Sequence, residues 1–216
     1  MQNHLAVIIP AAGNSLRFGL DKLSAQLGRR TVLEHTIAAF ADRDDVAEII
    51  LVGRAMPGVG KLRTVAGGRC RAVSVQNAVH AVNPAIEWVA VHDAARPLVS
   101  QELIDRIFAE ARRHGAAAPA LAVHLTIKQA VGPLPATVQK TIARDQLWAM
   151  QTPQIMRRAE LLEAFARCPI ALEQVTDDVQ LLELIGKTVR LVEGDERNLK
   201  ITRPIDLAIA NMMLDR

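Results

Sequence analysis

The stretch LAVIIPAAGNSLRFG, residues 5–19, decides the fold. Its first five residues are aliphatic and the run then passes into small residues, which is typical of a buried strand that feeds a loop. Gly13 and Gly19 permit backbone conformations that a Cβ would block, so the loop can bring N–H groups close to a polyphosphate. Arg17 and Lys22 would then supply cations beside the phosphates. An ordinary strand-to-helix turn with two solvated cations fits the same stretch.

The loop matches neither of two common phosphate-binding motifs. No Gly-Lys-Ser/Thr follows it, so it is not a Walker loop. The glycine spacing of the dinucleotide fingerprint is missing after Gly13, and no acidic residue follows a second strand at the expected place. A dinucleotide-dependent reductase is therefore poorly supported.

The composition favours one α/β domain over residues 1–216. Half of the residues are hydrophobic but only 3% are aromatic, so aliphatic side chains must build the core, as in a buried parallel sheet flanked by helices. The net charge of +3 suits small anionic ligands as readily as nucleic acid. Because so few aromatics cannot form a base-stacking platform, we expect no nucleic-acid partner.

The cysteines and the apolar segments indicate the compartment. Cys70 and Cys168 lie far apart and match no metal-ligand spacing, so we interpret them as free thiols in a reducing cytosol. The apolar start is short and has no basic leader, unlike a signal peptide. No run of about 18 apolar residues is present to span a membrane. We therefore expect a soluble, cytoplasmic protein.

Strands and helices alternate along most of the chain. Thr31 and Glu34 have the spacing of a capping box and predict a helix through Phe40. Ser74, Ser100 and Thr176 are expected to begin helices that end near residues 82, 115 and 186. Further expected elements are strands at 46–52, 87–92 and 188–192, a helix at 157–167, and a C-terminal helix with Pro204 in its first turn. This order predicts a mostly parallel sheet flanked by helices.

Residues 126–140 break the alternation. Two short strand-like runs flank the turn Gly-Pro-Leu-Pro at 132–135, and they hold too few apolar residues for a core of their own. We interpret the segment as a β-arm that projects from the domain and packs on a second subunit, which predicts a homodimer. A plain surface hairpin is the alternative.

A few polar residues stand where chemistry is expected. Asp93 directly follows a predicted strand, where an open α/β sheet places its ligand, so it is a candidate metal or ribose ligand with Arg96 as an anion clamp. A turn Asp that bonds its own backbone is the alternative. Lys200 in an apolar stretch requires an exposed face or a buried anionic partner. We interpret His92 as a packed strand-end residue rather than a catalyst.

Seven blocks, in chain order, resemble the bacterial 2-C-methyl-D-erythritol 4-phosphate cytidylyltransferases. They are PAAGNSLRFG…DK, GGRCRAVSVQNAV, VHDAARP, TIK, ARDQLWAMQTPQ, TDD and GDERNLKITRPIDL. LW-x-x-QTPQ and NLKIT-x-P-x-DL are the most distinctive, and the resemblance covers nearly the whole chain. It implies a Rossmann-like nucleotidyltransferase fold and a dimerising β-arm. It also implies a Mg²⁺-dependent reaction in which a polyol phosphate attacks the α-phosphorus of CTP and releases pyrophosphate.

The resemblance also implies roles for single residues. Arg17 and Lys22 match the residues that stabilise charge on the α-phosphate, and Arg144 and Lys200 match those that position the methylerythritol phosphate. The cytidine-recognition blocks contain Ala11, Ala12, Gly13 and Ser74. The substrate and metal region contains Asp93, Arg96, Thr126 and Thr152, with Asp93 as the metal ligand. These residue types suit phosphoryl transfer, which requires positioning and cations more than a proton shuttle.

Three positions depart from the usual pattern of that family. Asp21-Lys22-Leu23 stands in place of Pro-Lys-Gln in a loop about two residues shorter, Leu125 stands in place of an Asp, and Ser15 stands in place of the second loop glycine. Two alternatives therefore stay open beside methylerythritol phosphate. One is a ribitol-5-phosphate or other sugar-phosphate nucleotidyltransferase, and the other is a catalytically weak nucleotide-binding regulator.

Overall fold

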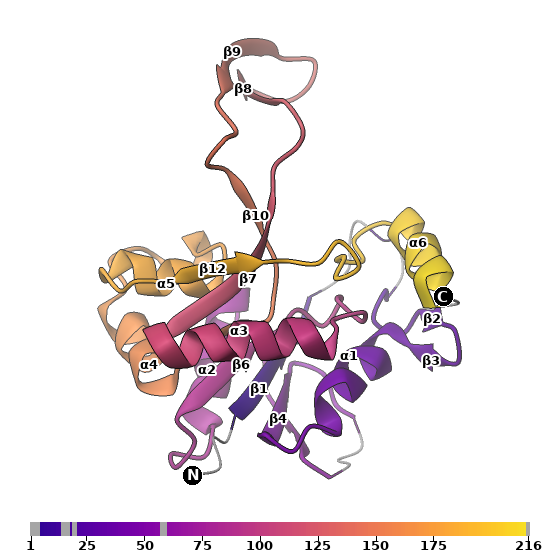
Figure 1. The fold of residues 1–216 in the computed structure, drawn as a ribbon, viewed down its shortest axis with the longest axis vertical. Helices are drawn as coiled ribbons and strands as arrows, with labels where there is room; N and C mark the ends of the chain where they lie inside the picture. Colours follow the sequence, from indigo (N-terminus) through magenta and orange to yellow (C-terminus); the bar gives the residue numbers. More distant parts are fainter. Residues whose placement is uncertain (1–4, 14–17, 19–20, 57–59, 215–216) are drawn as a thin grey trace.

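A central sheet organises the chain, of which the computed structural model describes residues 5–13, 18, 21–56 and 60–214 (Figure 1). The described residues form eight strands of this sheet: β1 (Leu5–Pro10), β4 (Val46–Val52), β5 (Leu62–Val65), β6 (Trp88–Val91), β7 (Ala116–Ala122), β10 (Trp148–Met150), β11 (Gln154–Arg157) and β12 (Arg190–Glu193). Their order is β10-β7-β11-β6-β1-β4-β5, and β12 pairs with β7. A small separate ribbon joins β2 (Gln26–Leu27) to β3 (Arg30–Thr31).

The sheet is mostly parallel, as predicted. β1 pairs in parallel with β4 and with β6, and β5 and β12 also pair in parallel with their neighbours. The exceptions are β11, which lies antiparallel between β6 and β7, and β10, which is antiparallel to β7. The carboxyl ends of β1 and β6 therefore meet at one edge, where an open α/β sheet binds its ligand.

Helices cover both faces of the sheet. They are α1 (Val32–Ala41), α2 (Arg71–Ala81), α3 (Gln101–His114), α4 (Arg158–Arg167), α5 (Asp178–Leu184) and α6 (Pro204–Leu214), with a 3-10 turn η1 (Leu172–Gln174). Side chains alternate along β1, so Val7 packs with α1 and α3 while Ile8 packs with α2 and α4. None of the described helices is long and apolar enough to cross a membrane.

The helix starts test the predicted caps. Thr31 and Glu34 form a capping box on α1, and the Ser100 side chain caps α3, as predicted. The prediction for Ser74 was wrong, because α2 begins at Arg71 and the Ser74 hydroxyl lies inside the helix, where it donates to the Cys70 carbonyl oxygen. The prediction for Thr176 was wrong by one residue, because Asp177 caps α5.

The expected β-arm is present. Strands β8 (Ile127–Val131) and β9 (Thr137–Ile142) pair with each other in a two-stranded antiparallel sheet. Figure 1 shows this hairpin projecting from the body beyond β10. Nearly all of its residues are exposed, so the hairpin buries little apolar surface within its own chain.

Candidate active site

A pocket opens where the carboxyl ends of β1 and β6 meet the start of α2. Its volume is about 360 Å³. Most of the residues predicted for the nucleotide and its phosphates line it, together with neighbours on α2 and the loop before it: Ala11, Ala12, Gly13, Lys22, Gly68, Arg69, Cys70, Arg71, Ser74, Asp93, Ala94, Ala95 and Lys200. The segments that contribute are far apart in the sequence, and the parallel pairing of β1 with β6 brings them together.

Small residues form one wall of this pocket. Gly53 has a φ of +77°, and a Cβ there would lie 2.3 Å from the Cβ of Ala12. A Cβ on Gly68 would lie 2.3 Å from the Val73 side chain. The Gly68 N–H donates to the Ser74 hydroxyl at 3.0 Å, which ties the loop to α2. The absence of a Cβ thus lets Gly53 pack against Ala12 and lets Gly68 pack against the start of α2.

Asp93 lies among three cations. Its Oδ2 is 3.0 Å from the Lys200 ammonium and 3.4 Å from the Arg96 guanidinium, and its Oδ1 is 3.8 Å from Arg71. Burial alone would raise the pKa of Asp93, but Lys200, Arg71 and Arg96 outweigh it and hold that pKa far below its ordinary value. The side chain is therefore a fixed carboxylate at neutral pH.

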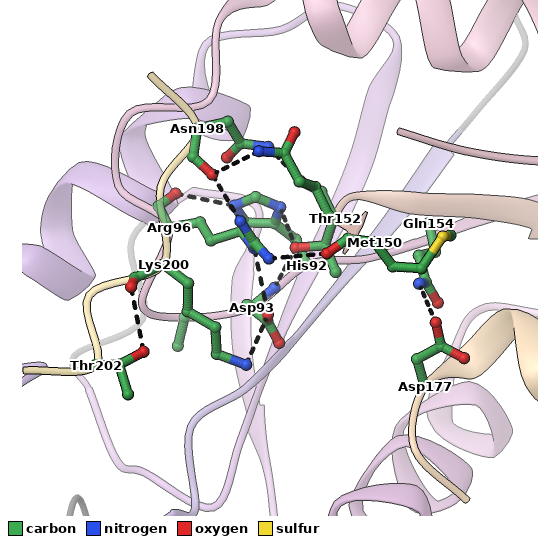
Figure 2. A network of polar contacts seen from close by, with 12 residues as sticks. His92, Asp93, Arg96, Met150, Thr152, Gln154, Asp177, Asn198, Lys200 and Thr202 are labelled. Carbon is green, nitrogen blue, oxygen red and sulfur yellow. Dashed lines mark hydrogen bonds and ion pairs between the residues drawn. The ribbon is translucent and has the colours of Figure 1, made fainter. Parts of the chain in front are cut away.

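A hydrogen-bonded chain behind Asp93 fixes its backbone (Figure 2). The Asp93 N–H donates to the Thr152 hydroxyl at 3.0 Å, and that hydroxyl lies 3.2 Å from His92 Nδ1. His92 Nε2 lies 3.0 Å from the Arg96 carbonyl oxygen. Since a carbonyl only accepts, Nε2 carries the proton and Nδ1 accepts from Thr152. Burial lowers the pKa of His92 to about 4, so the ring is neutral, and its packed position agrees with the sequence interpretation.

The Arg96 guanidinium binds to groups inside the protein. Its guanidinium donates to the carbonyl oxygen of Asn198 at 2.6 Å and to that of Met150 at 3.3 Å, besides its contact with Asp93. The Asn198 side chain donates in turn to the Thr152 carbonyl oxygen at 2.8 Å. Figure 2 shows how these contacts join the segment before Lys200 to the loop that holds Thr152. Arg96 and Thr152 thus support Asp93 from behind, and neither lines the pocket.

The predicted site residues other than Arg96 and Thr152 fall into three groups. Lys22, Lys200, Asp93 and Ser74 meet at the pocket with Ala11, Ala12 and Gly13. Thr126 and Arg144 lie exposed at the two ends of the β8–β9 hairpin, where Arg144 donates to the His124 carbonyl oxygen, and neither lines this pocket. Arg17 lies outside the described residues, so its role stays a prediction, as does the effect of Ser15.

The sequence interpretation missed Arg71. Its guanidinium lines the pocket and forms a 2.7 Å ion pair with the buried carboxylate of Asp178 on α5. The one available signal was its spacing, because Arg71 stands three residues before Ser74 and therefore shares a helix face with it. Its two acidic neighbours come from distant parts of the chain, which no local pattern reveals.

The donor set at Asp93 fits Mg²⁺ that arrives with a nucleotide. Among the described residues that line the pocket, Asp93 is the only carboxylate. Its Oδ1 accepts no hydrogen bond from the described residues, whereas Oδ2 faces Lys200 and Arg96. Mg²⁺ commonly binds through one or two carboxylates, several waters and the phosphates of its substrate. One available carboxylate oxygen beside phosphate-binding cations is sufficient for that mode.

Comparisons with known proteins agree with this geometry. A family model described as 2-C-methyl-D-erythritol 4-phosphate cytidylyltransferase matches residues 5–216. The chain is 38% identical over 211 residues to the protein of that name from Thermus thermophilus, covering 97% of this chain and 96% of the relative. It is 40% identical over 222 residues to a bifunctional enzyme IspD/IspF from Desulfotalea psychrophila, covering 97% of this chain and 56% of the relative. The chain thus spans about half the length of such bifunctional relatives.

Solved structures give the same result. The crystal structure of the Francisella tularensis 2-C-methyl-D-erythritol 4-phosphate cytidylyltransferase superposes with a TM-score of 0.86 at 33% identity, covering 97% of this chain and 99% of the other. The Thermus thermophilus structure has a TM-score of 0.81 at 36% identity, covering 97% and 98%. The fold and the sequence therefore match over the same extent.

Proposed function

The chain belongs to the 2-C-methyl-D-erythritol 4-phosphate cytidylyltransferase family, and we propose that it transfers a cytidylyl group from CTP to 2-C-methyl-D-erythritol 4-phosphate with release of pyrophosphate. One observation carries the proposal. Lys22, Lys200 and Asp93 line the same pocket as the small-residue wall of Ala12, Gly68 and Ser74. A nucleotide base can lie on that wall while its phosphates reach the cations.

The cations supply most of the catalysis in this proposal. The phosphate of the acceptor attacks the α-phosphorus of CTP, and the bond from that phosphorus to the pyrophosphate oxygen breaks. Negative charge grows on the α-phosphate oxygens in the transition state, and Lys22, with Arg17, stabilises it. Lys200 holds the acceptor phosphate, because Asp93 on its other side fixes the ammonium in place. The described pocket lining contains no histidine to act as a proton shuttle.

We also propose that Mg²⁺ is the cofactor and that Asp93 is its protein ligand. The cation would enter with the CTP phosphates and neutralise part of their charge.

The two cysteines, Cys70 and Cys168, are unpaired, which supports a reducing compartment, and we place the protein in the cytoplasm.

A homodimer is the proposed assembly, formed through the arm. Apolar side chains stand unusually exposed along it: Leu134 is 90% exposed, Leu125 77% and Val131 62%. Thr126 and Arg144 flank the β8–β9 hairpin and do not line the pocket of their own chain. In a closed two-fold dimer the arm of one chain meets the body of the other, so each pocket would receive these two residues from its partner.

A pyrophosphate-release assay tests the reaction. CTP, UTP, ATP and GTP are each paired with a panel of polyol phosphates. Release only with CTP and methylerythritol phosphate supports the proposal. Release with ribitol phosphate instead would identify ribitol phosphate as the acceptor. CTP binding without pyrophosphate release from any pair would identify the protein as a nucleotide-binding regulator.

Shortening the hairpin tests the assembly. Residues 130–138 are replaced by a two-residue turn, which leaves Thr126 and Arg144 in the chain and removes Leu134 and Val131. We expect monomers by light scattering and a large loss of turnover, with CTP binding retained because the pocket residues are untouched. A matched control replaces exposed Ile205 on α6 by Ser, which removes a similar apolar surface away from the arm. A fully active monomer would show that the arm is only a surface hairpin.

A further inference from the structure

One nitrogen of Arg71 faces two carboxylates. Its Nη2 lies 2.7 Å from Asp178 Oδ2 and 3.8 Å from Asp93 Oδ1. Asp178 is buried, with its side chain only 1% exposed, whereas Asp93 reaches the pocket. Burial by itself would lower the pKa of Arg71, but Asp178 and Asp93 outweigh it and raise that pKa, so the guanidinium stays charged. Its position is therefore set by a competition between two acidic side chains.

Gln154 fixes the position of Asp178, the nearer of the two carboxylates. Its side-chain oxygen accepts from the backbone N–H groups of Asp178 and Val179, at 2.9 and 3.0 Å. Its amide nitrogen donates to Asp177 at 2.9 Å. Gln154 belongs to β11, which lies between β7 and β6 in the sheet, so these hydrogen bonds attach the first turn of α5 to the central sheet. Asp178 therefore presents its carboxylate to Arg71 from a fixed place.

The two oxygens of Asp93 differ as a result. Oδ2 faces Lys200 and Arg96, whereas Oδ1 meets Arg71 only at 3.8 Å, which is beyond hydrogen-bond length. Moving the Arg71 nitrogen about 1 Å would make a direct hydrogen bond to Oδ1, and the ion pair with Asp178 prevents that move. Among the residues that the structure describes, none therefore donates a hydrogen bond to Oδ1 of this pocket-lining side chain.

We propose that Asp178 is a positioning residue that withholds Arg71 from Asp93 and so keeps Oδ1 available for the divalent cation that enters with the nucleotide. The inference rests on the proposed function, since it concerns the metal–nucleotide complex in that pocket. It assigns a role to the Asp177-Asp178 pair and to Gln154, which lie outside the pocket lining. Partners that orient a metal ligand commonly change metal affinity by about 10- to 100-fold when they are replaced.

The variant Asp178→Asn tests this role. It removes the charge that holds Arg71 and nearly preserves the side-chain shape, so Arg71 closes on Asp93 Oδ1. Calorimetry then measures CTP binding twice, once with Mg²⁺ and once with a metal chelator present. We expect the affinity for CTP with Mg²⁺ to fall about 10- to 100-fold, and the affinity for metal-free CTP to stay equal or rise. A purely structural role would weaken both by the same factor.

The double variant Asp178→Asn with Arg71→Gln provides a second test. It replaces the buried ion pair by a neutral pair, a change that proteins tolerate better than the loss of one partner. Because the competing cation is then absent, most of the Mg²⁺-dependent affinity should return. Glu173→Gln is the matched control, since it breaks the exposed pair with Arg69 on the pocket rim without touching Arg71. It should leave both affinities near those of the wild type.

The outcomes separate the two proposals. Equal losses with and without metal in Asp178→Asn, or no recovery in the double variant, would overturn the role of Asp178 while leaving the cytidylyl transfer intact. If Asp178→Asn does not fold, the double variant decides alone, because weak Mg²⁺-dependent binding in that folded protein contradicts the proposal. If the wild type shows no turnover with methylerythritol phosphate, and Asp178→Asn still weakens only the binding of CTP with Mg²⁺, the role of Asp178 is supported. Methylerythritol phosphate is then refuted as the acceptor.

Discussion

Replacing Gly53 by Ala should displace the pocket wall at Ala12 without changing any polar side chain. Gly53 follows β4, and its φ of +77° lies in the left-handed region that a side chain disfavours. The new Cβ would stand 2.3 Å from the Ala12 Cβ and 2.8 Å from the Ala12 Cα. Since the second of these atoms is backbone, rotation of a side chain cannot relieve the overlap. The loop after β1 must move.

The magnitude follows from these distances. Carbon atoms pack at about 3.5 Å or more, so Ala12 must retreat by roughly 1 Å. The left-handed conformation costs about 1–2 kcal/mol for a residue with a Cβ, and overpacking adds about 1–3 kcal/mol. The free energy of unfolding should therefore fall by about 2–5 kcal/mol. A displacement of about 1 Å in a reacting geometry can lower kcat/KM by roughly 10²-fold.

Gly186→Ala is the matched control for this experiment. Its φ of +78° is nearly the same as that of Gly53, but nothing lies within 4 Å of the added Cβ. Its free energy of unfolding should fall only by the cost of the left-handed conformation, about 1–2 kcal/mol, and the variant should bind CTP normally. Urea denaturation measures stability, calorimetry measures CTP affinity, and pyrophosphate release measures kcat/KM. Equal stability losses in the two variants, with normal CTP binding in Gly53→Ala, would refute the reasoning about Ala12.

Three further outcomes are expected. Lys22→Ala should lower kcat about 10²- to 10³-fold with a smaller effect on CTP affinity, and a variant that keeps a third of the wild-type kcat in steady-state assays would contradict its role at the α-phosphate. Arg144→Ala should raise the KM for the acceptor while CTP binding measured by calorimetry stays near normal. Arg144→Lys should restore that KM only partly, because lysine lacks the planar guanidinium fork. A loss of CTP binding in Arg144→Ala would reverse the assignment. Burial lowers the pKa of His92 from 6.5 to about 4, so the wild type should lose up to about 3 kcal/mol of stability as the pH falls through this range. Urea titrations of His92→Gln should lack that loss, and the same pH slope in both proteins would exclude His92 as its source.

Local signals in the sequence determined several elements of the fold. The aliphatic run of β1 and the small residues after it predicted the strand and loop, and the capping box at Thr31 located α1. The turn at 132–135 predicted the arm between β8 and β9. Such features act within a few residues of the chain, so a single sequence contains all of their information.

Other strands escaped notice because their local pattern is ambiguous. Strand β7 reads AAAPALA, in which Ala favours helix and Pro disfavours a central strand, yet it pairs with β10, β11 and β12. Tertiary burial overrides these propensities. The antiparallel insertion of β11 between β6 and β7 likewise depends on where a distant strand packs.

The roles of the charged residues divide in the same way. Local signals in the sequence placed Lys22 and Asp93 after strands that end at one sheet edge, and the family resemblance added Lys200, which lines the same pocket. Only the tertiary structure decided that Arg96 is enclosed by carbonyl oxygens, and that Arg71 stands between Asp93 and Asp178. The charge of a side chain is fixed by its chemistry, but its partners are fixed by packing between segments that no local pattern connects.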